Sequence, residues 1–141
     1  MYPRTDSGAL TTWVGVGGSP QSVVRAARHG LPLMIAIIGG ESHRFKPFVE
    51  LYHRALREFG HPALPVGVHS PGHIAESDDL ARDQLFAHMK AMRDKIGAER
   101  GWGPMSRAEY DHSAGPSGAL YVGSPETVAR KIASTARTLG L

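Results

Sequence analysis

Residues 13–30 read WVGVGGSPQSVVRAARHG, and this segment predicts a strand, a glycine turn and a helix in succession. Residues 13–16 are apolar and rich in β-branched side chains. Ser19 is a good helix N-cap, because its hydroxyl can accept from the N–H groups that open the helix. Pro20 suits the first helical position, where a missing N–H costs nothing, and Gly30 suits the helix end. The segment therefore predicts one β-α unit.

The start of this helix has the features of an anion site. The first-turn N–H groups have no partner within the helix, and the peptide dipoles place positive charge there. Gly17 and Gly18 lack a Cβ, so a phosphate could approach the backbone. Ser19 and Ser22 add hydroxyls, and Gln21 brings no negative charge. The alternative is an ordinary capped helix after a strand.

Two nucleotide-binding motifs do not fit this segment. A Walker loop needs Gly-Lys followed by Ser or Thr, which is absent. The dinucleotide fingerprint matches at Gly15 and Gly17, but Pro20 occupies the place of its third glycine. A phosphate here would therefore be held by a different kind of turn.

The rest of the chain continues the alternation of strands and helices. Residues 31–38 form an apolar run bounded by glycines, which is typical of a strand buried on both faces. Further elements are expected as strands at 63–75 and 118–122, and as helices at 43–59, 76–98 and 124–139. Parallel strands joined by helices form an α/β fold, and a complete (β/α)8 barrel takes roughly 250 residues. We expect a partial barrel of the TIM type with three or four parallel strands and crossover helices.

Two features follow the third strand. The helix at 76–98 carries an apolar stripe, which we expect to be core: Leu85, Met89, Met92 and Ile96. Residues 101–117 are rich in Gly and Pro and are expected to form a long loop, which is often functional.

Composition limits the class of protein. The chain has 141 residues with 41% hydrophobic and 21% charged residues, as expected for one globular domain. We expect a loose lead-in at 1–12 and a single domain at 13–141. The net charge of +3 is spread along the helices, so nucleic acid is not an expected partner. No apolar run is long enough for a membrane span, and the lack of cysteine is compatible with the cytoplasm.

The motif that starts the first helix occurs twice. Residues 18–25 read GSPQSVVR, and residues 123–130 read GSPETVAR. An ancestral repeat is possible, but both segments are efficient helix starts. Glu126 brings an acid to the second start, whereas Gln21 leaves the first one neutral. If one of the two binds phosphate, we expect it to be the first.

These segments resemble the luciferase-like flavin-dependent monooxygenases. The specific parts are AARHGLPL at 26–33 and VGSPETVA at 122–129. The resemblance extends over residues 13–139 and implies a (β/α)8 barrel that binds reduced FMN, or a deazaflavin in one branch. It implies oxidation of a small organic substrate with oxygen, and a possible flavin reductase as partner.

The resemblance also implies where the flavin lies. The phosphate would contact Gly18, Ser19 and Ser22, the same site that the helix start predicts together with Gly17. The isoalloxazine ring would lie near the end of the next strand, at Ile38, Gly39 and Gly40. The alternative for those glycines is a sharp turn between a strand and a helix.

The family's first four strands and its last strand have no counterpart in this sequence. Those parts hold the usual catalytic histidine of the family, so we cannot assign a catalytic residue by resemblance. Unpaired parallel strands invite association, and we expect a homo-oligomer. Two readings stay open: a flavin-dependent monooxygenase that is complete only by assembly or in a longer parent, and a non-catalytic flavin- or phosphate-binding fragment.

The histidines suggest little other chemistry. His69 is expected at the C-terminal end of the third strand, where barrel enzymes keep their reacting groups, so it is a weak catalytic candidate. A metal site from His69, His73 and Glu76 is a minor alternative, and our expectation is that no metal is bound.

Overall fold

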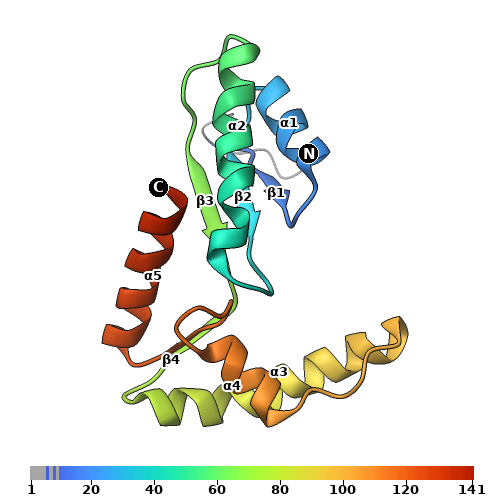
Figure 1. Cartoon of the computed structure of the whole chain (residues 1–141), viewed down its shortest axis with the longest axis vertical. Helices are drawn as coiled ribbons and strands as arrows, with labels where there is room; N and C mark the ends of the chain where they lie inside the picture. Colours follow the sequence, from blue (N-terminus) through green and yellow to red (C-terminus); the bar gives the residue numbers. More distant parts are fainter. Residues whose placement is uncertain (1–5, 7, 9) are drawn as a thin grey trace. The chain divides into compact units, whose positions relative to one another are not determined.

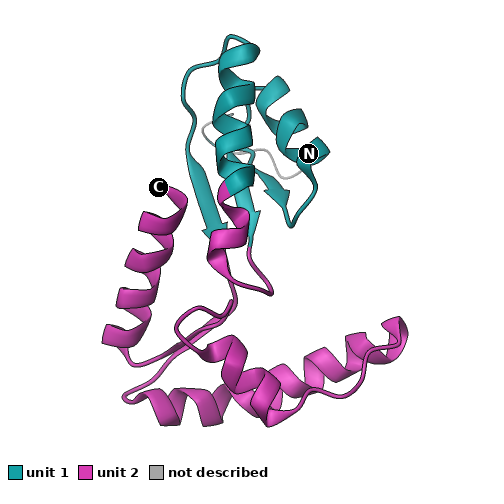
Figure 2. Ribbon diagram, in the orientation of Figure 1, with its two compact units in different colours: residues 1–36, 47–68 teal, residues 37–46, 69–141 magenta. Residues whose placement is uncertain are grey.

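A computed structural model describes residues 6, 8 and 10–141 (Figure 1). Residues 1–5, 7 and 9 of the expected lead-in lie outside the described residues. The chain divides into two compact units (Figure 2): the first holds the chain up to Ala36 together with Pro47–Val68, and the second holds Ile37–Lys46 and His69–Leu141.

The first unit contains the predicted β-α unit and a parallel sheet. Its strands and helices are β1 (Val14–Val16), α1 (Pro20–Arg28), β2 (Leu33–Ala36), and all but one end residue of α2 (Lys46–Glu58) and of β3 (Val66–His69). The strand order is β1-β2-β3. In the parallel pair β1–β2, Val14 lies opposite Leu33 and Val16 opposite Ile35. The structure therefore confirms the strand, turn and helix that residues 13–30 predict.

The core of this unit lies between the sheet and the apolar faces of α1 and α2. Its buried side chains are Val16, Val23, Ala26, Ala27, Leu33, Ile35, Val49, Tyr52, Ala55 and Leu56. The Tyr52 hydroxyl donates to the carbonyl of Leu31 at 2.7 Å, which satisfies the polar end of a fully buried ring. The prediction that the second strand is buried on both faces is wrong for β2. Its Leu33 and Ile35 face is buried, whereas Met34 and Ala36 on the other face are only half-buried.

The second unit contains the other elements. They are η1 (Ser42–Phe45), β4 (Gly72–Ile74), α3 (Asp78–Arg100), α4 (Arg107–Ala114), β5 (Tyr121–Gly123) and α5 (Pro125–Leu139). Strands β4 and β5 pair in parallel, with His73 opposite Val122. One buried cluster joins α3, α4 and β5 and includes Ala81, Met89, Met105, Tyr110, Ala114, Leu120 and Val122.

The single strand expected at 63–75 is instead two strands. Ser70 and Pro71 separate β3 from β4, and each strand pairs in a different sheet. Pro71 has no N–H for a ladder, so its carbonyl alone takes part, accepting from the Tyr121 N–H at 2.9 Å. The proline therefore ends one pairing and allows the next to begin.

The insert at 101–117 is not a continuous loop, because α4 lies within it. Ser106 caps this helix, accepting from the N–H of Glu109 at 3.1 Å, and Arg107 pairs with Asp111 one turn later at 3.0 Å. Tyr110 is fully buried and donates to the carbonyl of Arg82 at 3.0 Å. This aromatic side chain anchors the helix to α3.

The helix α3 carries the predicted stripe, but only part of that stripe is core. Met89 is buried, whereas Met92 is 52% exposed and Ile96 is 38% exposed.

No helix in residues 6, 8 and 10–141 is long and apolar enough to cross a membrane.

Candidate functional site

The first-turn backbone of α1, in the first unit, is partly used by its own cap. The Ser19 hydroxyl accepts from the N–H of Ser22 at 3.3 Å, and it donates to the side-chain oxygen of Gln21 at 3.2 Å. The Ser19 carbonyl accepts from the N–H groups of Ser22 and Val23 at 3.1 and 3.2 Å. The N-cap prediction is confirmed, and the capping leaves Gln21 as the first-turn N–H without a backbone partner among the described residues.

The twin glycines give the turn before α1 its shape. Gly18 has φ of 139°, a conformation that side chains with a Cβ rarely adopt. A Cβ on Gly17 would meet the Ala36 carbonyl oxygen at 3.9 Å. Both glycines and Ser19 are exposed, and the first turn contains no acidic residue. The turn is therefore open, positively polarised and uncrowded.

The helix α5 repeats the motif, and its start is closed by an acid. The carboxylate of Asp78 accepts from the Ser124 N–H at 2.7 Å and from the Thr127 hydroxyl at 3.0 Å. These two bonds lower the pKa of Asp78, with the Ser124 N–H as the larger cause. Glu126 lies in the first turn as expected, and Asp78 adds a second negative charge that bonds the helix start directly.

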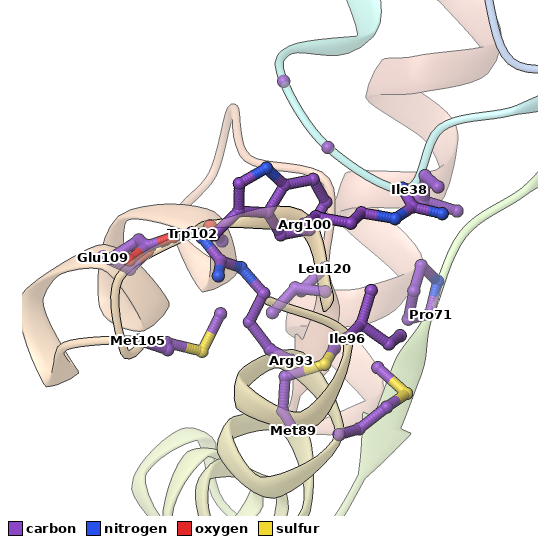
Figure 3. A pocket seen from close by; sticks show the side chains of 14 residues that line it. Ile38, Pro71, Met89, Arg93, Ile96, Arg100, Trp102, Met105, Glu109 and Leu120 are labelled. Atoms are coloured by element: carbon purple, nitrogen blue, oxygen red, sulfur yellow. Dashed lines mark hydrogen bonds and ion pairs between the residues drawn. The ribbon is translucent and has the colours of Figure 1, made fainter. Parts of the chain in front are cut away.

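The second unit holds an apolar cavity of about 710 Å3 (Figure 3). One wall is the segment Ile38–Gly40, where Ile38 is 69% exposed and a Cβ on Gly39 would meet no atom within 4 Å. The other lining residues are Pro71, Met89, Met92, Arg93, Ile96, Arg100, Trp102, Met105, Glu109, Ser113 and Leu120. This volume lies in the range of pockets that hold organic ligands.

Arg93 holds the loop after α3 against the cavity. Its guanidinium donates to the carbonyl of Gly103 and to the carboxylate of Glu109, each at 3.2 Å. The same guanidinium lies 4.7 Å from the centre of the Trp102 ring, a cation–π contact. These contacts fix the loop's aromatic side chain at the cavity (Figure 3).

Two further interactions support this wall. Asp94 accepts from the N–H of Met105 at 2.7 Å and pairs with Lys90, and the Lys90 bond is the larger cause of its lowered pKa. Arg100 stands 5.2 Å from the Trp102 ring centre. The wall therefore combines apolar side chains with guanidinium groups at its edge.

The structure brings only part of the predicted site together. Ile38, Gly39 and Gly40 line one cavity in the second unit, whereas Gly17, Gly18, Ser19 and Ser22 belong to the first unit. His69 ends β3 with an exposed side chain, and its carbonyl accepts from the Ile37 N–H at 2.8 Å. His69 is thus tied by its backbone to the residue that precedes the cavity wall.

Sequence reasoning missed the residues from α3 and its loop, including Arg93, Arg100 and Trp102. The available signal was a stripe that mixes Met and Arg at helical spacing and runs into a glycine-rich loop with Trp102. A stripe of that kind suits a cavity wall better than a dry core.

His73 bonds Gln84 at 2.8 Å, and no metal-binding group of three residues occurs in the described part of the chain.

Comparisons with known proteins agree on the fold. The solved structure of the monooxygenase RslO1 from Streptomyces bottropensis matches with a TM-score of 0.71 and 20% identity, covering 99% of this chain and 41% of that one. The FMN complex of the oxygenating constituent of 3,6-diketocamphane monooxygenase from Pseudomonas putida, a type II Baeyer-Villiger monooxygenase, matches with a TM-score of 0.62 and 19% identity. That match covers 91% of this chain and 38% of the other.

A third match is the coenzyme F420 dependent tetrahydromethanopterin reductase from Methanopyrus kandleri. Its TM-score is 0.60 at 14% identity, covering 89% of this chain and 42% of that one. This chain therefore spans about two fifths of the length of these relatives, as a part of their TIM-type barrel fold. No curated protein sequence matches it. The sequence model of the luciferase-like monooxygenases matches residues 1–141, and the chain belongs to that family.

Proposed function

We propose that this chain carries the flavin-binding part of a luciferase-like, flavin-dependent monooxygenase. The observation that carries the proposal is the apolar cavity beside Ile38–Gly40, in a chain that belongs to this family. The open space beside Gly39 suits a flat ring system, because no side chain fills it. Bound reduced flavin would supply the electrons with which oxygen is activated.

The phosphate of FMN is assigned to the turn that precedes α1. Gly17 and Gly18 allow close approach to the backbone, and the Gln21 N–H and the hydroxyls of Ser19 and Ser22 would donate to the phosphate oxygens. The absence of an acidic residue from this first turn supports the choice. The start of α5, in contrast, is filled by Asp78.

The protein's part in the reaction is positioning and shielding. Met89, Met92 and Ile96 would exclude water from the ring and substrate, and Trp102 would form part of the cover. His69 stays a candidate for contact with the substrate, which we take to be a small organic molecule. Deazaflavin is the alternative cofactor, because one solved relative is an F420-dependent reductase.

A titration with FMN tests the proposal. Quenching of flavin fluorescence that saturates at one FMN per chain supports it, and no uptake by a folded, full-length chain contradicts it. The second reading is a flavin- or phosphate-binding fragment without catalysis. Uptake of FMN without reductase-driven oxygen consumption would select that reading.

A further inference from the structure

A second cavity, of about 400 Å3, lies in the second unit and shares no residue with the first one. It is lined by α3, α5, the last residue of α4 and the turn that follows, and its polar side chains are Asp78, Arg82, Thr127, Arg130, Lys131 and Ser134. Three of these side chains are basic and one is acidic. The lining therefore has an excess of two positive charges when all four groups are ionised.

The single acid is already engaged in another contact. Asp78 accepts from the Ser124 N–H at 2.7 Å and from the Thr127 hydroxyl at 3.0 Å. Arg130 donates to that same hydroxyl, at 3.1 Å, rather than to a carboxylate. Among the described residues, neither Arg82 nor Arg130 forms an ion pair within 4.0 Å.

Arg82 has a donor without an acceptor. Its Nε atom is buried and has no hydrogen-bond partner within the described part of the chain. A buried guanidinium N–H that lacks a partner is unfavourable, so an acceptor supplied from outside would stabilise it. Because Nε itself is closed to solvent, a ligand in the cavity would bind the terminal N–H groups of Arg82, which form no hydrogen bond within the described residues either.

Lys131 adds a positive charge on the opposite helix. It is only 8% exposed, and its Nζ donates to the carbonyls of Gly115 and Leu120, each at 2.6 Å. Burial, and then the nearby Arg82, lower the pKa of Lys131 to about 8. Arg82 is thus near Lys131, whose own acceptors are neutral carbonyls, and an anion beside these two cations would reduce their repulsion.

We propose that this cavity binds a tetrahedral oxyanion of phosphate size, with Arg82 and Arg130 as its ligands and the Ser134 hydroxyl as a further donor. Arginine suits this role because its N–H groups match the spacing of phosphate oxygens. The ligand could be inorganic phosphate or the phosphate end of a small ester. The inference is independent of the flavin assignment, because it concerns other residues and another cavity.

A titration with inorganic phosphate, followed by ³¹P line broadening at constant ionic strength, tests this site. We expect saturable binding by the full chain and roughly tenfold weaker binding by Arg82→Met, which removes one charge-assisted donor group. The control is Arg137→Met, an exposed arginine of α5 outside the cavity. Equal weakening by both variants would show attraction by net charge alone and would overturn the proposal, as would the absence of saturation.

A second measurement needs no substitution. Phosphate bound beside Lys131 should raise the pH at which the Lys131 Cε resonance titrates, because an anion favours the ammonium form. If saturating phosphate leaves the titration of the Lys131 resonance unchanged, the proposed site is contradicted.

Methyl phosphate distinguishes the two possible ligands. An affinity equal to that for inorganic phosphate indicates that the site accepts phosphate esters, and no binding of methyl phosphate indicates that it accepts inorganic phosphate alone. The comparison with methyl phosphate is made only after saturable binding of inorganic phosphate has been observed.

Discussion

The carboxylate of Asp78 accepts a hydrogen bond from the backbone N–H of Ser124 at 2.7 Å, across 46 residues of sequence. An acid of the chain thus occupies the start of α5. The matching motif at the start of α1 has only its Ser19 cap and the neutral Gln21. Two segments of nearly the same sequence thus form one helix start occupied by an acid and one that is not, and this difference underlies the proposed cofactor site.

Replacing Asp78 by Asn should destabilise the second unit, because the neutral amide is a weaker acceptor for the Ser124 N–H and the Thr127 hydroxyl. Thermal unfolding followed by circular dichroism would show a lower midpoint for Asp78→Asn. The control Asp79→Asn alters an exposed acid in the same turn of α3 and should shift the midpoint less. Equal shifts would mean that only the helix dipole is involved.

The same bond predicts a dependence of stability on pH. The Ser124 N–H and the Thr127 hydroxyl lower the pKa of Asp78 in the folded chain below its ordinary value of 3.8. The unfolded chain therefore binds this proton first as the pH falls. The stabilisation by Asp78 is complete above 3.8 and is lost as the pH falls through the lower folded value. Denaturant curves of Asp78→Asn should lack this part of the acid dependence.

Lys131 also predicts a stability that rises with pH, but in the alkaline range. Burial lowers its pKa from 10.5 to about 8, so the folded chain releases this proton before the unfolded chain does. Between these values the free energy of unfolding should rise with pH, by at most about 3 kcal/mol. Lys131→Met should lack that rise, whereas Lys95→Met, at an exposed position of α3, should keep it. Parallel curves for the wild type and Lys131→Met would contradict this account.

Tyr110 should be a main determinant of stability in the second unit. Its ring is fully buried beside Phe86, and its hydroxyl donates to the Arg82 carbonyl. We expect Tyr110→Phe to cost about 1 kcal/mol, through one lost hydrogen bond, and Tyr110→Ala about 3 to 5 kcal/mol, through a cavity. Urea denaturation measures both. A loss below about 1 kcal/mol for Tyr110→Ala would show that α4 does not depend on this anchor.

A substitution at Gly39 should affect flavin binding without affecting folding. A Cβ at this position meets no atom within 4 Å, and its φ is not in the left-handed region, so Gly39→Val should leave the unfolding midpoint nearly unchanged. The new side chain would stand in the proposed place of the ring and should weaken FMN binding roughly tenfold or more. Gly15→Val, also in open space but on β1, is the matched control. Unchanged FMN affinity in Gly39→Val would remove the ring assignment.

Local signals predicted much of this fold. Ser19, Pro20 and the apolar period placed α1, because caps and amphipathic spacing act within a few residues. The break at Ser70–Pro71 was missed because it depends on which strands pair, which is not a local property. The helix α4 was missed because glycine and proline around it masked the capping pair Ser106 and Glu109.

The candidate sites were harder to predict for the same reason. Ile38, Gly39 and Gly40 follow a strand, so their place beside a cavity could be expected. The contributions of Arg93 and Trp102 depend on a loop folding back onto α3, with the Trp102 N–H bonded to the Gly97 carbonyl at 2.9 Å. Glu126 lies in the first turn of α5 as expected, but the contact of Asp78 with Ser124 joins distant segments and could not be read from the local sequence.

The central claim is that the open start of α1 binds the phosphate of FMN. Riboflavin has the same ring without the phosphate, so comparing the two affinities isolates that contact. We predict that the wild-type chain binds FMN at least about tenfold more tightly than riboflavin, and that Ser22→Ala, which keeps the Ser19 cap, narrows this ratio. Equal affinities for FMN and riboflavin in the wild-type chain would contradict the claim.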